Sequence, residues 1–336
     1  AIAKELGILR EGDKAVTGTQ LSQMSDEEFE REFQNISVYA RVQPEHKTRI
    51  VSAWRKAGYV TAMTGDGVND APSIKSADIG VGMGITGTDV TKNVADMVLA
   101  DDNFATIVGA VEEGRRIYDN IRKAIQFLLG SNMSEVISIF VATILGFTIL
   151  KPVHLLWINL VTDCFPALAL GMEKAEGNIM RRRPRPAKDG IFAGGMGFDI
   201  AYQGVLISAL VLAAYFVGHY IETGVWTITD SADGTTMAFL TMSMAEICHS
   251  FNMRSLRGCI FTMGTKNKAL TWAALGSIAA TTLVCEVPFL AEAFGFTPVS
   301  FAEYVIAMGI GMLGMVIVEI VKTFQRRAMR KRGEIL

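Results

Sequence analysis

The first part of this chain is organised around the segment Met63-Thr64-Gly65-Asp66-Gly67-Val68-Asn69-Asp70-Ala71-Pro72. It follows the apolar run 59–62, which is typical of a buried strand, and it ends at a proline suited to starting a helix. Asp66 and Asp70 therefore fall in a loop at the carboxyl end of a strand, where open α/β sheets bind their ligands. Carboxylate oxygens beside the exposed amides of a glycine-rich loop suit magnesium together with a phosphate group.

Strands and helices alternate on both sides of this loop. Helical periodicity covers 1–9, and Ser25-Asp26-Glu27-Glu28 matches a capping box that starts a helix ending near Phe33. Pro44 and Gly58 frame a helix over 44–57. The segments with strand patterns are 36–41, 59–63, 78–83 and 98–99. This alternation predicts a parallel sheet, of which only part is present.

The composition divides the chain into two parts. It has 336 residues, 50% of them hydrophobic, and a formal net charge of −2. Polar residues dominate the first 125 or so positions and long apolar segments follow, which indicates a soluble part and a membrane part. The near-neutral charge gives no reason to expect nucleic acid as a partner. The four cysteines lack paired spacing, so neither a disulfide framework nor a zinc site is indicated.

A polar helical pattern over 102–123 continues into the apolar segment 124–147. We expect one long helix here, a cytosolic stalk that becomes the first of six membrane spans. The other expected spans, each approaching the roughly 20 residues that a bilayer requires, lie near 153–173, 198–221, 236–253, 269–291 and 300–322. A soluble helical bundle is the alternative, and six such runs in one chain disfavour it.

Basic residues cluster after the second, fourth and sixth expected spans. They lie in the loops 174–188 and 254–268 and in the tail 322–332, whereas the loop 222–233 is acidic. The positive-inside rule therefore places the soluble part, the basic loops and the C-terminus in the cytosol. Six spans also return the chain to the side on which it starts.

Polar side chains recur inside the expected spans. By helical spacing, Asn132 shares a face with Glu135 in the first span. In the second span, Asn159, Thr162 and Asp163 share a face just before Pro166, a residue that can bend its helix. Glu246 lies in the fourth span. An acid in hydrocarbon costs at least about 2.5 kcal/mol, so these three acids are candidates for a functional role. The alternative interpretation is that they lie near the ends of their spans. Three carboxylates, two amides and a hydroxyl form an all-oxygen set, which suits calcium better than copper or zinc.

The segment around Asp66 resembles the hinge motif of P-type cation-transporting ATPases. Residues 40–47 (ARVQPEHK) and 97–104 (MVLADDNF) resemble its flanking segments in that family, and the resemblance, which covers the whole chain, is closest to the calcium pumps. It implies an α/β fold for 1–112, the C-terminal part of a haloacid-dehalogenase-like phosphorylation domain. It implies a stalk helix, an all-α membrane domain of six transmembrane helices and a cytosolic basic tail for 113–336.

The resemblance also implies roles for individual residues. Lys47 corresponds to a lysine that contacts the phosphoryl group, although by itself it also fits a solvated lysine on an amphipathic helix. Asp66 then binds Mg²⁺, Asn69 hydrogen-bonds the phosphoryl oxygens and Asp70 steadies the loop. The residues that match one Ca²⁺ site are Asn132, Glu135, Thr162, Asp163 and Glu246, while Asn159 and Asp163 belong to a second site that also needs an earlier span.

Other parts of that family are absent from these residues. They contain neither the Asp-Lys-Thr-Gly-Thr segment with the phosphorylated aspartate, nor a nucleotide-binding domain, an actuator domain or earlier spans. The chain also begins Ala1-Ile2-Ala3-Lys4, without an initiator methionine or a signal-peptide pattern, so we expect a piece of a longer protein. Without the nucleophile no aspartyl-phosphate can form, and the piece alone is expected to be inactive.

We therefore expect the carboxy-terminal half of an ATP-driven calcium pump that exports Ca²⁺ from the cytosol. Its expected partners are the lipid bilayer, Ca²⁺ and the missing amino-terminal half, which binds most of the ATP. One alternative is a pump for another cation, such as Na⁺ or H⁺. The other is a non-catalytic membrane module that binds ions.

Overall fold

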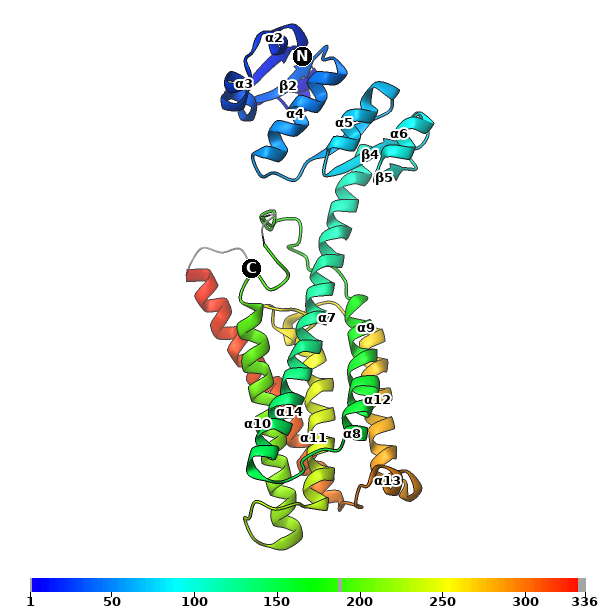
Figure 1. Cartoon of the computed structure of the whole chain (residues 1–336), viewed down its shortest axis with the longest axis vertical. Helices are drawn as coiled ribbons and strands as arrows, with labels where there is room; N and C mark the ends of the chain where they lie inside the picture. The colour runs from blue at the N-terminus through cyan, green and yellow to red at the C-terminus, as the bar shows by residue number, and fades with distance from the viewer. Residues whose placement is uncertain (1, 187–188, 332–336) are drawn as a thin grey trace. The chain divides into compact units, whose positions relative to one another are not determined.

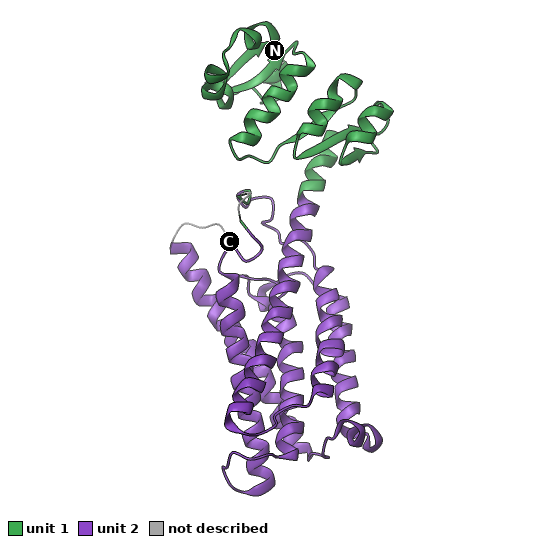
Figure 2. Ribbon diagram, viewed as in Figure 1, with its two compact units in different colours: residues 1–111, 184–189 green, residues 112–183, 190–336 purple. Residues whose placement is uncertain are grey.

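The computed structural model describes residues 2–186 and 189–331, which form two compact units (Figures 1 and 2). As far as they are described, residues 1–111 and 184–189 make up the first unit, and 112–183 and 190–336 make up the second. The first unit contains small parallel sheets with short helices, whereas the described residues of the second contain helices and no strand.

The strands of the first unit pair in parallel, as predicted, but in two separate sheets. β1 (Lys14–Thr17) pairs with β2 (Ile36–Ala40), while β3 (Ala62–Gly65), β4 (Ile79–Met83) and β5 (Met97–Leu99) form a sheet in the order β3-β4-β5. Gly65 lies opposite Gly82, so the loop that follows β3 starts at the carboxyl edge of this sheet.

Short helices connect these strands. They are α1 (Ile2–Glu5), α2 (Gly18–Gln23), α3 (Asp26–Glu32), α4 (Pro44–Lys56), α5 (Ala71–Ser76) and α6 (Asp89–Val94), with 3-10 turns at Phe33–Asn35 and Val68–Asp70. Ser25 caps α3 by accepting the Glu28 N–H at 3.1 Å, and Pro44 is the first residue of α4, as predicted. One apolar core lies between β1, β2 and these helices: Val16, Leu21, Phe29, Phe33, Ile36 and Ala53.

Two predicted elements have different bounds in the structure. The helix predicted over 1–9 extends only over Ile2–Glu5, because Gly7 adopts a left-handed backbone with φ of 69°. The strand predicted over 59–63 begins at Ala62, because Tyr59 still belongs to the turn that ends α4, where its N–H donates to the Trp54 carbonyl at 3.2 Å. The sequence pattern also misses α2 and α6, since six residues are too few to show helical periodicity.

Long helices dominate the second part of the chain. The helix α7 (Phe104–Leu145) has 42 residues without interruption, as predicted for the stalk and first span. The elements after it are α8 (Pro152–Trp157), a π-helical segment (Ile158–Asp163), α9 (Cys164–Gly171), α10 (Met196–Thr223), α11 (Ala232–Asn252), a 3-10 turn (Ile260–Thr262), α12 (Lys268–Glu286), α13 (Pro288–Phe294) and α14 (Phe301–Lys331). The helix predicted over 269–291 is broken at Val287, because Pro288 starts a new helix.

Among the described residues, five helical segments are long and apolar enough to cross a membrane: Phe104–Leu145, Pro152–Gly171, Met196–Thr223, Lys268–Glu286 and Phe301–Lys331. The segment predicted as a span over 236–253 forms the helix α11 but does not meet this criterion. The surroundings of α11 explain its polar composition, because it packs against α10, α12 and α14 and most of its residues are buried (Figure 1). Polar side chains on such a helix face other helices.

The helices α14 and α11 approach each other closely at Gly311. A Cβ added to Gly311 would lie 2.8 Å from the carbonyl oxygen of Thr241 and 3.0 Å from the backbone nitrogen of Ala245, both on α11. Because backbone atoms move only with their helix, this position requires glycine. Gly309, also on α14, has no atom within 4 Å of an added Cβ.

We expect Gly311→Ala to destabilise the helical bundle by about 1–3 kcal/mol, because the new methyl group forces α11 and α14 apart. The matched variant Gly309→Ala should change the stability by less than about 1 kcal/mol. Thermal unfolding of the purified chain in detergent measures both effects. Equal midpoints for the two variants would contradict the close approach of these helices.

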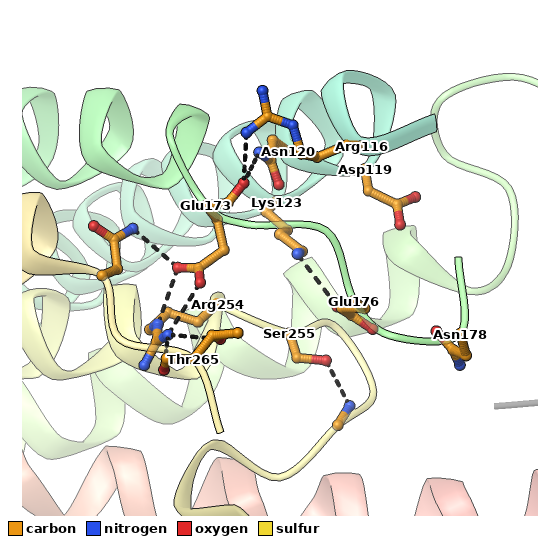
Figure 3. A network of polar contacts seen from close by, with 12 residues as sticks. Arg116, Asp119, Asn120, Lys123, Glu173, Glu176, Asn178, Arg254, Ser255 and Thr265 are labelled. Carbon is orange, nitrogen blue, oxygen red and sulfur yellow. Dashed lines mark hydrogen bonds and ion pairs between the residues drawn. The ribbon is translucent and has the colours of Figure 1, made fainter. Parts of the chain in front are cut away.

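Glu173, two residues beyond the end of α9, holds several loops of the second unit together (Figure 3). Its side chain is 1% exposed, and its carboxylate accepts two N–H groups of Arg254 at 3.0 Å and the Asn267 amide at 2.9 Å. Its backbone carbonyl accepts the Asn120 amide of α7 at 2.7 Å. Burial alone would raise the pKa of Glu173, but the hydrogen bonds and charge of Arg254 together with the Asn267 amide hold this pKa below its usual value.

We expect Glu173→Gln to destabilise the fold by about 3–5 kcal/mol at neutral pH, because it leaves the Arg254 guanidinium without its buried partner. A carboxyl whose pKa is lowered by folding stabilises above its unfolded pKa of about 4.3, and this contribution is lost as the pH falls through the lower folded value. The difference in melting temperature between wild type and variant should therefore be largest above about pH 5 and shrink toward pH 3. The exposed Glu292→Gln provides the control, and a difference that does not change with pH would contradict the assignment.

Candidate functional site

The loop after β3 brings Asp70 directly against Gly65. A Cβ added to Gly65 would lie 2.4 Å from the Cβ of Asp70, so the loop admits only glycine at this position. A single 3-10 turn over Val68–Asp70 follows, and α5 then begins with Ala71 and Pro72. The helix predicted to start at this proline is therefore present and begins one residue earlier.

Asp70 is a buried carboxylate held by two donors. The Lys47 ammonium on α4 donates to Oδ1 at 2.5 Å, and the Gly67 N–H donates to Oδ2 at 3.3 Å. Burial on its own raises the pKa of Asp70, but the hydrogen bonds from Lys47 and Gly67 bring this pKa below its usual value. Asp70 is therefore ionised at neutral pH and fixes the lysine ammonium beside the loop.

Asp66 and Asn69 lie in the same loop with exposed side chains. The Asp66 backbone carbonyl accepts the Thr88 N–H at 3.0 Å, which ties the loop to the residue that precedes α6. Lys47 contacts this loop through its ion pair with Asp70, and it forms no ion pair with Asp66 in the described part of the chain. The four predicted residues thus share one loop edge, with Asp70 inside and Asp66 and Asn69 at the surface.

This arrangement fits a magnesium ion and a phosphate group. Mg²⁺ is usually held by one or two carboxylates and completes its coordination with water and phosphate oxygens. The exposed Asp66 carboxylate can serve as such a ligand, while the Asn69 amide and the Lys47 ammonium can donate to phosphate oxygens. Asp70 is already engaged by Lys47 and serves to hold the loop.

The polar residues of the second expected span lie in the π-helical segment Ile158–Asp163. Here the Cys164 N–H bonds to the carbonyl of Asn159, five residues earlier. Pro166 has no N–H to donate to the carbonyl of Thr162, so the regular helical ladder is interrupted at this point. The interruption predicted from Pro166 is therefore a π-helical segment. Such segments are frequent at functional sites.

Side chains of this segment meet side chains of α7. The Asn159 amide donates to both carboxylate oxygens of Glu135, at 2.9 Å and 3.1 Å. The Ser131 hydroxyl donates to Oδ1 of Asp163 at 3.0 Å. Two segments that are separate in the sequence, both long and apolar enough to cross a membrane, are thereby joined through carboxylates.

A third carboxylate reaches the same place from α11. Glu246 is completely buried, and its Oε2 accepts the Thr162 hydroxyl at 3.3 Å. Within the described residues, Oε1 of Glu246 and Oδ2 of Asp163 are buried without any hydrogen-bond partner. Buried carboxylate oxygens without donors are costly, so a cation that binds between them is strongly stabilised.

We call Ser131, Glu135, Asn159, Thr162, Asp163 and Glu246 the oxygen cluster. Asn132, which the sequence groups with Glu135, is not part of it, because its side chain is exposed and its amide donates back to the Leu128 carbonyl of α7 at 2.8 Å. Ser131 was missed by the sequence argument. It lies one helical turn before Glu135, and this spacing of four residues could have identified it.

The oxygen cluster offers only carboxylate, amide and hydroxyl groups. Such hard ligands are those that calcium prefers. No group of three or more His, Cys, Asp or Glu side chains in the described part of the chain lies close enough together to hold a metal ion. The cluster as it stands therefore provides part of a coordination shell.

Comparison with known proteins adds independent evidence. Residues 147–324 match a family described as the C-terminus of cation-transporting ATPases. The calcium-transporting ATPase 1 of Bacillus cereus is 44% identical over 334 residues, which cover 96% of this chain and 38% of that protein. The calcium-transporting ATPase of Bacillus subtilis is 41% identical over 314 residues, covering 93% of this chain and 35% of that protein. The human calcium-transporting ATPase type 2C member 1 is 34% identical over 328 residues, which cover 97% of this chain and 35% of that protein.

The chain spans little more than a third of the length of these relatives. The family match extends over more than half of the chain and contains α8 to α13 together with most of α14, and thus two of the three helical segments that build the oxygen cluster. The chain therefore belongs to the family of cation-transporting ATPases and contains the C-terminal region of such a protein.

Proposed function

We propose that this chain is the carboxy-terminal part of an ATP-driven calcium pump. The observation that carries the proposal is the oxygen cluster, in which Glu135, Asp163 and Glu246 are buried among helices suited to a membrane. Hard oxygen ligands suit Ca²⁺, and the relatives named above are calcium-transporting ATPases. Ca²⁺ is then the substrate that the cluster binds and that the complete pump exports from the cytosol.

The relatives are almost three times as long as the matched region, so we assign part of the activity to residues beyond this chain. An amino-terminal part supplies the phosphorylated aspartate and most of the ATP site. The chain alone then hydrolyses no ATP, because it lacks the nucleophile. Its partners are that amino-terminal part, the lipid bilayer and Ca²⁺.

We assign residues 1–112 to the C-terminal part of a haloacid-dehalogenase-like phosphorylation domain, and 113–336 to the stalk, the membrane domain and the basic tail. The parallel order β3-β4-β5, with the Asp66 loop at the carboxyl end of β3, supports the first assignment. We take α11 as the fourth of six spans, because a helix enclosed by other helices exposes few polar groups to lipid. The basic loops and the C-terminus are then cytosolic.

In the phosphorylation site, Asp66 holds Mg²⁺ and Asn69 hydrogen-bonds the phosphoryl oxygens. When bound, Mg²⁺ supplies positive charge that stabilises the phosphoryl group during transfer. Lys47 adds a second positive charge at the same edge. Asp70 acts as the positioning residue, since it holds Lys47 at 2.5 Å and also accepts the Gly67 N–H.

In the membrane, we assign Glu135, Thr162, Asp163 and Glu246 to one Ca²⁺ site. Asn159 and Asp163 contribute to a second site, which an earlier span completes. The family resemblance also assigns Asn132 to the first site. To take part, its amide has to leave the Leu128 carbonyl, to which it is bonded at 2.8 Å.

The complete reading frame that contains this chain provides the test. Sequencing the DNA upstream of the Ala1 codon should show an open frame that encodes Asp-Lys-Thr-Gly and further apolar spans. The expressed protein should form a phosphoenzyme from ATP only when Ca²⁺ is present. A requirement for Na⁺ or protons would establish a pump for another cation, and Ca²⁺ binding without phosphorylation would establish a non-catalytic module.

Asp163→Asn in the complete pump should weaken the apparent Ca²⁺ affinity about 100-fold or more, or about 2.7 kcal/mol, because it removes a buried carboxylate from the cluster. The control is Glu286→Gln, which neutralises an exposed acid at the end of α12. Phosphoenzyme formation as a function of Ca²⁺ concentration measures both. An unchanged affinity in Asp163→Asn would remove this residue from the ion site.

Lys47→Met should slow phosphoenzyme formation at saturating Ca²⁺ by about 10²–10³-fold, because it removes the positive charge beside the phosphoryl group. Lys75→Met serves as the control, since Lys75 is exposed on α5. Rapid-quench measurements with labelled ATP distinguish the two variants. Equal rates would show that Lys47 only pairs with Asp70.

A further inference from the structure

A cavity of about 640 Å³ lies in the second unit, away from the oxygen cluster. It is lined by residues of α7, by the loop between α9 and α10, by the loop between α11 and α12, and by the end of α14. None of the oxygen-cluster residues lines it. Its volume falls within the range of about 300–1,000 Å³ that small-molecule sites occupy.

Positive charge dominates the walls of this cavity. Six basic residues line it: Arg122, Lys123, Arg182, Arg257, Arg326 and Arg330. Two acids, Asp119 and Glu176, also line it, and a third, Asp199, pairs with Arg257 at 2.7 Å. Six positive and three negative charges leave an excess of three positive charges among the described residues.

Two of these cations contact only neutral groups among the residues that the structure describes. Arg122 donates to the backbone carbonyls of Ile191 and Ala193, and Arg326 donates to the carbonyl of Arg257. These hydrogen bonds fix the guanidinium groups in place but leave their charges uncompensated. The walls are therefore preorganised for an anion.

Lys123 is the buried member of this set, with 2% of its side chain exposed. Its ammonium pairs with Glu176 at 3.2 Å (Figure 3). The same carboxylate also pairs with Arg182 at 2.7 Å. An ammonium has three N–H donors, and Glu176 is the partner of Lys123 among the residues that the structure describes. A buried ammonium that shares its counter-ion is stabilised by a further anion in the cavity.

We propose that this cavity binds a phosphate-bearing anion. Guanidinium groups bind phosphate oxygens through paired N–H donors. Basic pockets between membrane helices also bind the headgroups of anionic lipids. The phosphate can belong to a lipid headgroup or to a soluble phosphate ion, and both present the same chemistry to Lys123 and the arginines.

The test uses the whole chain, purified in a neutral detergent and free of added phosphate. Binding of phosphatidylglycerol, phosphatidylcholine and inorganic phosphate is measured separately by native mass spectrometry and by the shift in melting temperature. We expect saturable binding of phosphatidylglycerol at least about tenfold tighter than that of phosphatidylcholine. Lys123→Met and the exposed Arg330→Gln should each weaken it at least about fivefold. Arg183→Gln, an exposed loop variant outside the cavity, should not weaken it.

The probes separate the two sources of phosphate. Binding confined to phosphatidylglycerol and sensitive to Lys123 and Arg330 identifies a lipid headgroup. Binding of inorganic phosphate with the same sensitivity identifies a soluble ion. The proposal is overturned if neither probe binds saturably, if Lys123→Met and Arg330→Gln bind as wild type does, or if Arg183→Gln weakens binding as much as they do.

Discussion

Carboxylates buried among helices need donors or a cation, because removing a charge from water costs more than a packing contact returns. Glu246 on α11 imposes this constraint on the second unit, since one of its oxygens is bonded to Thr162 and the other has no donor in the described residues. α11 can carry this acid because α10, α12 and α14 enclose it. Gly311 on α14 permits part of this close packing.

The elements that the sequence predicts well are those with local signals. Ser25 accepts the N–H of the residue three positions later, Pro44 fits the first turn of a helix, and the apolar residues of α7 continue for many turns. The separation of the strands into two sheets has no such signal, because pairing depends on contacts between residues far apart in the chain. The short elements β1, α2 and α6 were missed for lack of length.

The structure brings together the three acids that the sequence predicted for the candidate ion site, whereas the polar residues around these acids were predicted less well. A charged residue in an apolar segment is conspicuous, so Glu135, Asp163 and Glu246 could be found without a structure. Ser131 and Asn132 are adjacent in the sequence, and helical spacing allows either to share a face with Glu135. Only the contact between Ser131 and Asp163, which joins two helices, shows which face is turned inward.

The loop after α9 is bonded to α7, so α7 and the segment with Asp163, which together carry most of the oxygen cluster, are connected at two places. Asn120 of α7 donates to the backbone carbonyl of Glu173 at 2.7 Å, and Ser131, three turns further along α7, donates to Asp163 at 3.0 Å. The first contact lies at the loop and the second in the oxygen cluster. Because an α-helix resists stretching, a displacement of α7 along its axis strains both contacts unless the segment with Asp163 moves as well. In the calcium pump proposed above, a displacement of α7 therefore changes the geometry of the cluster through two helices at once.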